Sequence, residues 1–276
     1  MRSVILPDQT PVPALGQGTW RMGEDARLRK QEIAALRTGV ELGMTLIDTA
    51  EMYGDGATET LLGEALARLR DRVFLVSKVY PQNAGRGRIE RACEASLRRL
   101  RTDRLDLYLL HWRGSVPLAE TIEGMEALVA AGKIARWGVS NLDTADMAEL
   151  LRAGGEACAT NQILYNVTER GAEFDLLPQL SQRHIPTMAY SPVGQGRLPK
   201  SPALSAIAQR LGVTTFQVAL AWVLRDPRVI AIPKASDEAH VRANRKALDI
   251  ALSPEDLGAI DADFPPPTRK TRLAML

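Results

Sequence analysis

Short apolar runs alternate along the whole chain with segments in which apolar residues recur every three or four positions. The recurring spacing, as at residues 31–43 and 121–133, is typical of helices with one buried face. The short runs predict eight strands, at residues 13–20, 45–50, 73–78, 105–112, 134–141, 158–163, 186–192 and 229–235. Strand–helix alternation favours βαβ units around a parallel sheet. A chain of 276 residues suits one such barrel, so we predict an α/β fold, a (β/α)8 TIM barrel, as a single domain over residues 1–276.

Three further segments fall outside the eight-fold pattern. Residues 3–12 contain two short apolar stretches around a Pro-Asp turn, which predicts an N-terminal β-hairpin closing that end of the barrel. Residues 236–249 and 253–263 each begin with serine and carry acidic residues in the first turn, as helix N-termini do. We therefore predict extra C-terminal helices there, followed by an irregular tail over residues 264–276.

The composition is that of an ordinary globular protein, 45% hydrophobic and 25% charged. With 35 basic and 33 acidic residues and no long run of one sign, we expect no nucleic-acid partner. No apolar stretch approaches a membrane span or a secretory signal, so no membrane association is expected either. The two cysteines lack metal-site spacing, which favours a reducing cytoplasm. No apolar surface stripe stands out, so a monomer is expected.

Four polar residues stand at or just after the ends of predicted strands: Asp48, Tyr53, Lys78 and His111. In a barrel of this kind, residues at the carboxyl ends of strands are typically catalytic. Tyrosine is a weak acid with a pKa of about 10, and a neighbouring Lys78 ammonium is expected to lower that pKa. Asp48 would keep Lys78 charged, while His111 would hold a carbonyl oxygen. The set predicts reduction of an aldehyde or ketone, with Tyr53 giving the proton.

Each of these residues alone has a simpler interpretation. Asp48 could cap a helix, Lys78 could be a solvated strand end, His111 a buried structural histidine and Tyr53 a packing aromatic. Their agreement in position favours the catalytic interpretation. Two other chemistries are compatible with parts of this set. A Schiff-base aldolase or lyase could use Lys78, but pairing with Asp48 should keep it protonated. A metal hydrolase is disfavoured because the three histidines form no cluster in the sequence.

Ordered motifs along the chain resemble the aldo-keto reductases over essentially its whole length. They are DTAEMYG, LVSKVY, LLHW, RWGVSN, ATNQILYN, AYSP and AIPKASDEAHVRAN. The family's catalytic tetrad falls on the four residues named above. The motifs are also similar to a bacterial branch that includes methylglyoxal reductases. The resemblance implies NADPH-dependent reduction of small aldehydes and 2-oxoaldehydes such as methylglyoxal.

The resemblance also implies NADP(H) at the carboxyl-terminal mouth of the barrel. Matching positions are Ser140, Asn141 and Gln162 for the nicotinamide carboxamide, Tyr190 for its ring, Ser191 for the pyrophosphate, and Lys234, His240 and Asn244 for the adenosine end. Many members carry an arginine where this chain has His240, and a mostly neutral imidazole grips a 2′-phosphate more weakly. A smaller preference for NADPH over NADH is therefore expected. A Rossmann cofactor site is not supported, because no G-x-G-x-x-G follows a strand.

Trp20, Tyr80 and Trp112 are expected to wall the substrate pocket, although each could instead be rim packing. Few polar groups accompany them, which fits small aldehydes better than phosphorylated sugars. The resemblance implies an open, shallow pocket because the tail is short. It also implies fast cofactor exchange because the loop at 191–208 is short. An alternative is a non-catalytic, NADP(H)-binding regulatory subunit, but all four reactive residues are present, which favours turnover.

Overall fold

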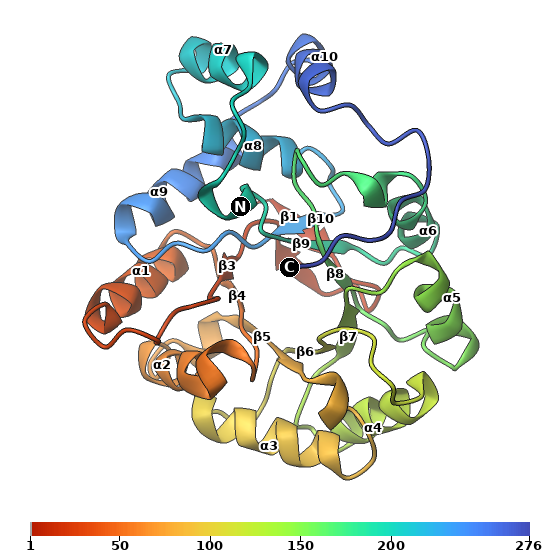
Figure 1. Cartoon of the computed structure of the whole chain (residues 1–276). Coiled ribbons are helices and arrows are strands. Elements are labelled where there is room, and N and C mark those ends of the chain that lie inside the picture. The colour runs from red at the N-terminus through yellow and green to blue at the C-terminus, as the bar shows by residue number, and fades with distance from the viewer. Residues whose placement is uncertain (1) are drawn as a thin grey trace.

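The computed structural model describes residues 2–276. Its centre is an eight-stranded, entirely parallel sheet whose strands follow one another in chain order. Helices surround this sheet (Figure 1). The strands are β3 (Gln17–Gly18), β4 (Leu46–Asp48), β5 (Phe74–Val79), β6 (Leu107–Leu110), β7 (Trp137–Ser140), β8 (Asn161–Leu164), β9 (Thr187–Tyr190) and β10 (Val229–Ala231). All eight predicted strands are present, mostly shorter than the apolar runs that indicated them.

The two edges of the sheet meet next to β3 and β10. The Gly16 N–H donates to the Ala231 carbonyl at 2.8 Å, and the Gly18 N–H donates to the Pro233 carbonyl at 3.1 Å. A side chain at Gly18 would not fit, because a Cβ there would lie 2.6 Å from the Ile232 carbonyl oxygen. Glycine thus permits the close backbone approach that curls the sheet into a barrel.

Eight helices form the outer ring: α1 (Arg29–Glu41), α2 (Ala57–Ala65), α3 (Arg88–Leu100), α4 (Leu118–Ala130), α5 (Thr144–Arg152), α6 (Leu176–Gln182), α8 (Thr215–Val223) and α9 (Glu238–Lys246). Short 3₁₀ turns occupy Tyr53–Gly56, Arg70–Arg72, Pro81–Asn83, Gly171–Glu173, Gly194–Gly196 and Ala247–Asp249. Helix α9 packs on α1. It therefore completes the ring, and the prediction that residues 236–249 lie outside the eight-fold pattern is wrong.

Two helices lie outside the ring, α7 (Pro202–Leu211) and α10 (Pro254–Asp263), which pack on each other (Figure 1). Helix α10 was predicted. Helix α7 begins inside the segment expected to be a loop, because Ser201 caps it and Pro202 takes its first position.

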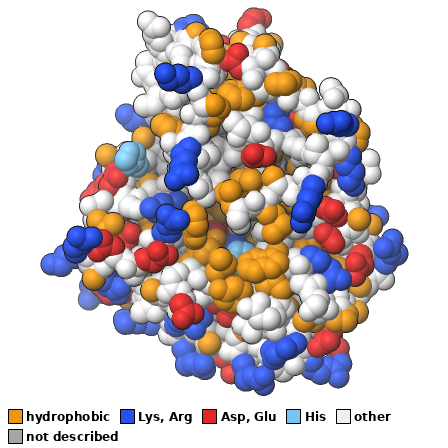
Figure 2. Space-filling model, in the orientation of Figure 1, with side chains coloured by type: hydrophobic (Ala, Val, Ile, Leu, Met, Phe, Trp, Pro, Cys, Tyr) orange, Lys and Arg blue, Asp and Glu red, His pale blue; other side chains and the backbone are white. Residues whose placement is uncertain are grey.

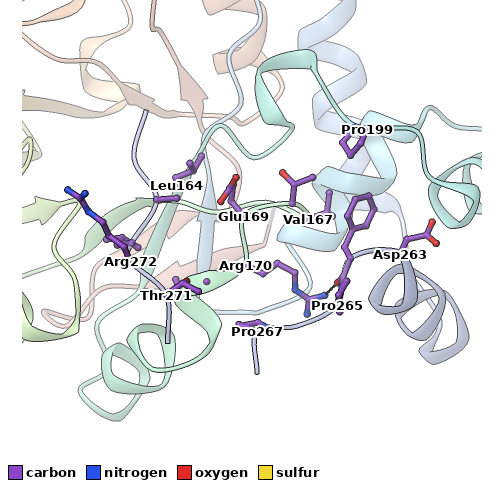
Figure 3. A pocket seen from close by; sticks show the side chains of 16 residues that line it. Leu164, Val167, Glu169, Arg170, Pro199, Asp263, Pro265, Pro267, Thr271 and Arg272 are labelled. Atoms are coloured by element: carbon purple, nitrogen blue, oxygen red, sulfur yellow. Dashed lines mark hydrogen bonds between the residues drawn. The ribbon is translucent and has the colours of Figure 1, made fainter. Parts of the chain in front are cut away.

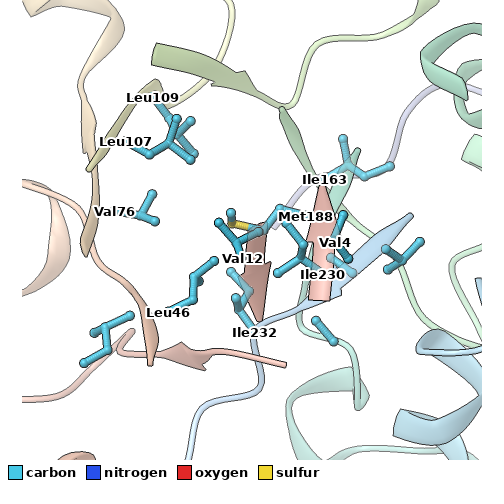
Figure 4. Packing of buried hydrophobic residues seen from close by; sticks show 14 of the residues in the cluster. Val4, Val12, Leu46, Val76, Leu107, Leu109, Ile163, Met188, Ile230 and Ile232 are labelled. Atoms are coloured by element: carbon cyan, nitrogen blue, oxygen red, sulfur yellow. The ribbon is translucent and has the colours of Figure 1, made fainter. Parts of the chain in front are cut away.

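The N-terminal hairpin is present, as predicted. Strands β1 (Ser3–Ile5) and β2 (Pro11–Pro13) pair antiparallel, and exposed Gln9 lies in the turn between them. Val4 and Val12 are buried in the same hydrophobic cluster as Leu46 and Ile230 (Figure 4). Since Leu46 opens its strand, the hairpin covers the amino-terminal end of the barrel and leaves the other end for chemistry.

Both cysteines are free thiols in the interior, Cys93 on α3 and Cys158 just before β8. Burial raises the pKa of each thiol to about 12. From Phe264 onward the tail has no regular structure and crosses to the barrel mouth, where Figure 1 marks the C-terminal end. Within residues 2–276, no helix is both long enough and apolar enough to cross a membrane.

Candidate active site

The mouth of the barrel gathers the polar strand ends. Asp48 is the last residue of β4, Lys78 lies near the end of β5, and His111 follows β6 directly. Tyr53 opens the 3₁₀ turn after β4. Figure 2 shows this face, where hydrophobic side chains gather around a histidine in a central hollow.

The ammonium of Lys78 contacts three oxygens. It lies 2.8 Å from Asp48 Oδ2, 2.8 Å from the Thr49 carbonyl oxygen and 3.2 Å from the Tyr53 hydroxyl. The lysine side chain is fully buried. Burial by itself lowers the pKa of Lys78, but the attraction of Asp48 and Tyr53 outweighs it, so the pKa is raised overall. Lys78 therefore stays protonated at neutral pH, as a buried ion pair with Asp48 requires.

The phenol of Tyr53 behaves differently from the expectation. Burial raises its pKa, and this effect outweighs the opposing attraction of Lys78. The prediction of a lowered pKa is thus wrong, since sequence spacing gave the neighbour but not the loss of solvent. Because Lys78 donates to the Tyr53 oxygen, the phenolic hydrogen is free to be donated elsewhere.

The imidazole of His111 is neutral. Burial, aided by the nearby Lys78 ammonium, lowers its pKa to about 2. The ring stands edge-on to Tyr53, with centroids 6.0 Å apart. Its Nδ1 atom is buried without a hydrogen-bond partner among the described residues. A neutral ring donates from one nitrogen only, so His111 can offer a hydrogen bond without offering a second acidic proton.

A fifth side chain joins this group. The amide Nε2 of Gln162, on β8, donates to Asp48 Oδ1 at 2.7 Å. Both carboxylate oxygens of Asp48 are therefore engaged, one by Lys78 and one by Gln162. The sequence placed Gln162 only among the cofactor residues. Its contact with Asp48 joins residues far apart in the chain, and no local motif indicates such a pair.

Asn141 connects the backbone of His111 to other residues that are expected to bind the cofactor. Its amide donates to the His111 carbonyl at 3.1 Å and to Ser140 Oγ at 3.1 Å, and its oxygen accepts from the Tyr190 hydroxyl at 3.0 Å. Ser140 in turn donates to the Gln162 carbonyl at 2.9 Å. Asn141 adopts the left-handed conformation, φ 59°, which asparagine tolerates better than most residues. The four residues expected at the nicotinamide are thus one hydrogen-bonded group.

The residues expected at the adenosine end lie on the β10–α9 segment. Lys234 is exposed, Asn244 is half-buried on α9, and His240 is 76% exposed in its side chain. The His240 ring contacts the carboxylate of Asp237 at 2.5 Å, and Asp237 also caps α9. The imidazole therefore shares its site with a negative charge, which the sequence did not indicate. Ser191 lies on another segment, directly after β9.

The aromatic residues expected to wall the pocket divide into two groups. Tyr80 and Trp112 meet edge-on with centroids 5.8 Å apart, and Trp112 lies 4.8 Å from the His111 ring. Trp20 is 38% exposed and carries the guanidinium of Arg21 over its face at 4.5 Å. The first pair is therefore adjacent to His111, whereas no aromatic ring contact among the described residues links Trp20 to that group, and its place in the pocket wall stays a prediction.

The tail reaches further than expected. Leu273 packs against the core, and the Leu276 N–H donates to the Tyr190 hydroxyl at 3.4 Å. The irregular tail is therefore held beside Tyr190, and the expectation of an open, shallow substrate pocket stays a prediction. A cavity of about 480 Å³ lies between the tail and the loop after β8, lined by residues such as Glu169 and Arg272 (Figure 3). None of the four strand-end residues lines it.

Comparison with known proteins identifies the protein family. The sequence profile of the aldo/keto reductase family matches residues 14–263. The chain belongs to the aldo/keto reductase family. It is accordingly an oxidoreductase, and the resemblance noted from the motifs is confirmed.

Among curated relatives of this aldo/keto reductase, methylglyoxal reductase YeaE of Escherichia coli K12 is 56% identical over 271 residues, covering 96% of this chain and 95% of that protein. An aldo-keto reductase of Mycobacterium avium is 33% identical over 266 residues, covering 94% and 88%. An aldo/keto reductase from Klebsiella pneumoniae, crystallised with NADP and acetate, superposes with a TM-score of 0.97 at 56% identity, covering 100% of this chain and 99% of that one. A Klebsiella structure with NADPH has a TM-score of 0.97 at 57% identity and the same coverage.

Proposed function

We propose that this aldo/keto reductase reduces small aldehydes and 2-oxoaldehydes, methylglyoxal among them, with NADPH. The observation that carries the proposal is the buried Lys78 ammonium held between Asp48 and the Tyr53 hydroxyl, beside a neutral His111. The 56% identity to a methylglyoxal reductase supports the substrate class. The Klebsiella structures with NADP and NADPH support the cofactor.

Tyr53 is the proposed proton donor. Its raised pKa keeps the phenol protonated at neutral pH, and a developing alkoxide is a far stronger base than a phenolate. Once the proton has left, the phenolate lies against the Lys78 ammonium, which stabilises it. In this scheme Lys78 stabilises the phenolate that proton transfer forms. It does not bring the pKa of Tyr53 below its ordinary value beforehand.

His111 is the proposed orienting residue. A neutral imidazole holds a carbonyl oxygen by one hydrogen bond while Tyr53 supplies the other. A pKa of about 2 keeps the ring from competing as the acid. Two donors aimed at one oxygen stabilise the charge that develops there.

The residues at the mouth fit NADP(H). When bound, this cofactor supplies the hydride. Asp48 fixes the orientation of the Gln162 amide, because only its NH₂ side can face a carboxylate, and the Gln162 oxygen is left to accept from a carboxamide. We propose that Ser140 and Asn141 complete this contact and that the Tyr190 ring carries the nicotinamide.

At the other end, Ser191 is proposed to face the pyrophosphate. Lys234, for which residues 2–276 provide no ion-pair partner, is proposed to face the 2′-phosphate beside His240 and Asn244.

The alternative with Lys78 as a Schiff-base nucleophile is disfavoured. An amine must lose its proton to attack a carbonyl, whereas Asp48 and Tyr53 raise the pKa of Lys78. Its fully buried position also leaves it behind Tyr53 rather than open to a substrate.

The deciding experiment measures NADPH consumption with methylglyoxal for wild type and Tyr53→Phe, with NADH as a second cofactor. We expect fast turnover by the wild type and loss of turnover in the variant. The NADPH affinity of the variant should be nearly the same as that of the wild type. Equal turnover in the variant would mean that Tyr53 is not the donor. Tight NADPH binding without turnover on any aldehyde would instead favour a regulatory subunit.

A further inference from the structure

Glu51 lies between Asp48 and Tyr53 in the loop after β4, yet it contacts none of the reactive side chains. Its Oε1 accepts from the Tyr80 backbone N–H at 2.7 Å and from the Asn83 amide at 3.1 Å. Its own N–H donates to the Lys78 carbonyl at 3.3 Å. One half-buried carboxylate therefore ties the loop that carries Tyr53 to the loop that follows β5.

The Tyr80 loop in turn contacts the loop after β6. The Tyr80 ring meets Trp112 edge-on. Pro81 packs so closely on Gly114 that a Cβ at Gly114 would lie 2.4 Å from the Pro81 Cβ. Arg113 fixes the far side of this loop by donating to the Val116 carbonyl at 2.9 Å and pairing with Glu149 at 2.9 Å.

The loop after β5 thus contacts both of its neighbours at the mouth, the loop after β4 and the loop after β6. The loop after β6 has its own anchor in Arg113, and the loop bearing Tyr80 is held by Glu51. We propose that Glu51 is a positioning residue for the substrate pocket: by holding the Tyr80 backbone it fixes the aromatic wall of Tyr80 and Trp112, and so sets which carbonyl compounds fit. This inference rests on the proposed function.

The role depends on an acceptor oxygen and not on charge. Glu51 is not among the main groups that shift the pKa of Lys78 or Tyr53. Together with burial, its charge raises the pKa of Tyr80, which leaves that phenol neutral. Glu51→Gln keeps an oxygen at the same place, whereas Glu51→Ala removes it. The two variants therefore separate the hydrogen bond from the negative charge.

Asp106, which lies just before β6, offers a matched control because it also bonds to the backbone of β5. Its Oδ2 accepts from the Leu75 N–H at 2.9 Å, so it makes the same kind of bond at the opposite end of β5. Asp106→Ala should lower stability, because Asp106 also pairs with Arg70 at 2.9 Å, without changing selectivity.

The experiment compares kcat and KM for methylglyoxal and for a bulky aromatic aldehyde, 2-naphthaldehyde. For Glu51→Ala we expect the KM for methylglyoxal to rise about fivefold, the equivalent of one hydrogen bond. We expect kcat to stay within about twofold and the preference for methylglyoxal over 2-naphthaldehyde to fall. Glu51→Gln and Asp106→Ala should keep the wild-type preference. Unchanged selectivity in Glu51→Ala, or the same loss in Glu51→Gln, overturns the proposal.

A second measurement does not need turnover. Hydrogen–deuterium exchange at residues 80–83 should quicken in Glu51→Ala and stay near wild type in Glu51→Gln, because the Tyr80 N–H loses or keeps its acceptor. Unchanged exchange in Glu51→Ala would show that the loop is held by other contacts, which also overturns the proposal. A wild type that reduces no aldehyde would refute the proposed function but leave this measurement interpretable.

Discussion

The side chains of Gln162 and Asp48, two residues that are each only 2% exposed, are joined by a hydrogen bond of 2.7 Å. The bond links a residue expected to hold the nicotinamide to the carboxylate that pairs with Lys78. In the proposed site, binding of the cofactor and orientation of the proton-donating group therefore depend on the same amide. A substitution at Gln162 should affect both.

We expect Gln162→Leu to lower kcat at saturating NADPH by about tenfold, in addition to weakening NADPH binding. The reason is that a hydrogen bond to a charged group contributes roughly 1.5–3 kcal/mol. Steady-state kinetics and a fluorescence titration with NADPH measure the two effects separately. If kcat is unchanged and only NADPH binding suffers, Gln162 serves the cofactor alone.

Removal of one member of the buried ion pair should be costly. We expect Lys78→Met to abolish turnover and to lower the free energy of unfolding by about 3–5 kcal/mol, because Asp48 keeps a buried, unpaired charge. The double variant Asp48→Asn with Lys78→Met should regain much of that stability while staying inactive. Denaturant unfolding provides the measurement. Equal stability of the single and double variants would count against the pairing argument.

The pH profile of kcat should be flat through neutrality. The donor form of Tyr53 is the protonated one, and its pKa is raised above the ordinary value of 10.0. Activity should therefore be complete below that pH and be lost only as the pH rises through the raised pKa. Initial rates in overlapping buffers with NADPH saturating would reveal this. An inflection between pH 6 and 9 would show that another group limits the rate.

His111 should make the protein sensitive to acid. Its folded-state pKa of about 2 lies below its ordinary value of 6.5, so in that interval the unfolded chain binds a proton that the folded chain does not. Stability therefore decreases as the pH falls below 6.5, by up to about 1.4 kcal/mol per pH unit. Unfolding measured at pH 7 and pH 5 should show a smaller decrease in His111→Asn. An equal decrease would place the acid sensitivity elsewhere.

Cofactor preference should respond to the contact between His240 and Asp237. Asparagine is also a good helix cap, so Asp237→Asn keeps α9 intact while removing the negative charge beside the ring. We expect Asp237→Asn and His240→Arg each to tighten NADPH binding by about threefold or more, with NADH unaffected, since the gain is to the 2′-phosphate. Fluorescence titrations at low and high salt test this, and the gain should shrink with salt. Equal gains for both cofactors would contradict the assignment.

The sequence predicted the parts of the fold that depend on local pattern. Continuous apolar runs predict the strands, and the polar residues at their ends predict the mouth, so the positions of Asp48, Lys78 and His111 follow from the sequence. Helix α7 is not predicted, although Ser201 and Pro202 give a good N-terminal signal, because the Gly- and Pro-containing stretch before them is typical of a loop.

The other features that the sequence does not predict depend on contacts between residues that are far apart in the chain. The pKa of Tyr53 depends on how much solvent surrounds it, which spacing does not reveal. The bonds of Gln162 to Asp48 and of Glu51 to Tyr80 join separate strands and loops. The sequence indicates Glu51 only by its position between two of the predicted catalytic residues.

The two buried cysteines and the exposed hairpin turn have a practical consequence. With thiol pKa values of about 12, Cys93 and Cys158 resist modification in the folded protein. A Gln9→Cys substitution would place an accessible thiol on the turn that covers the closed end of the barrel. Coupled through that single point to a bead or an electrode, every molecule would present its open mouth to the solution.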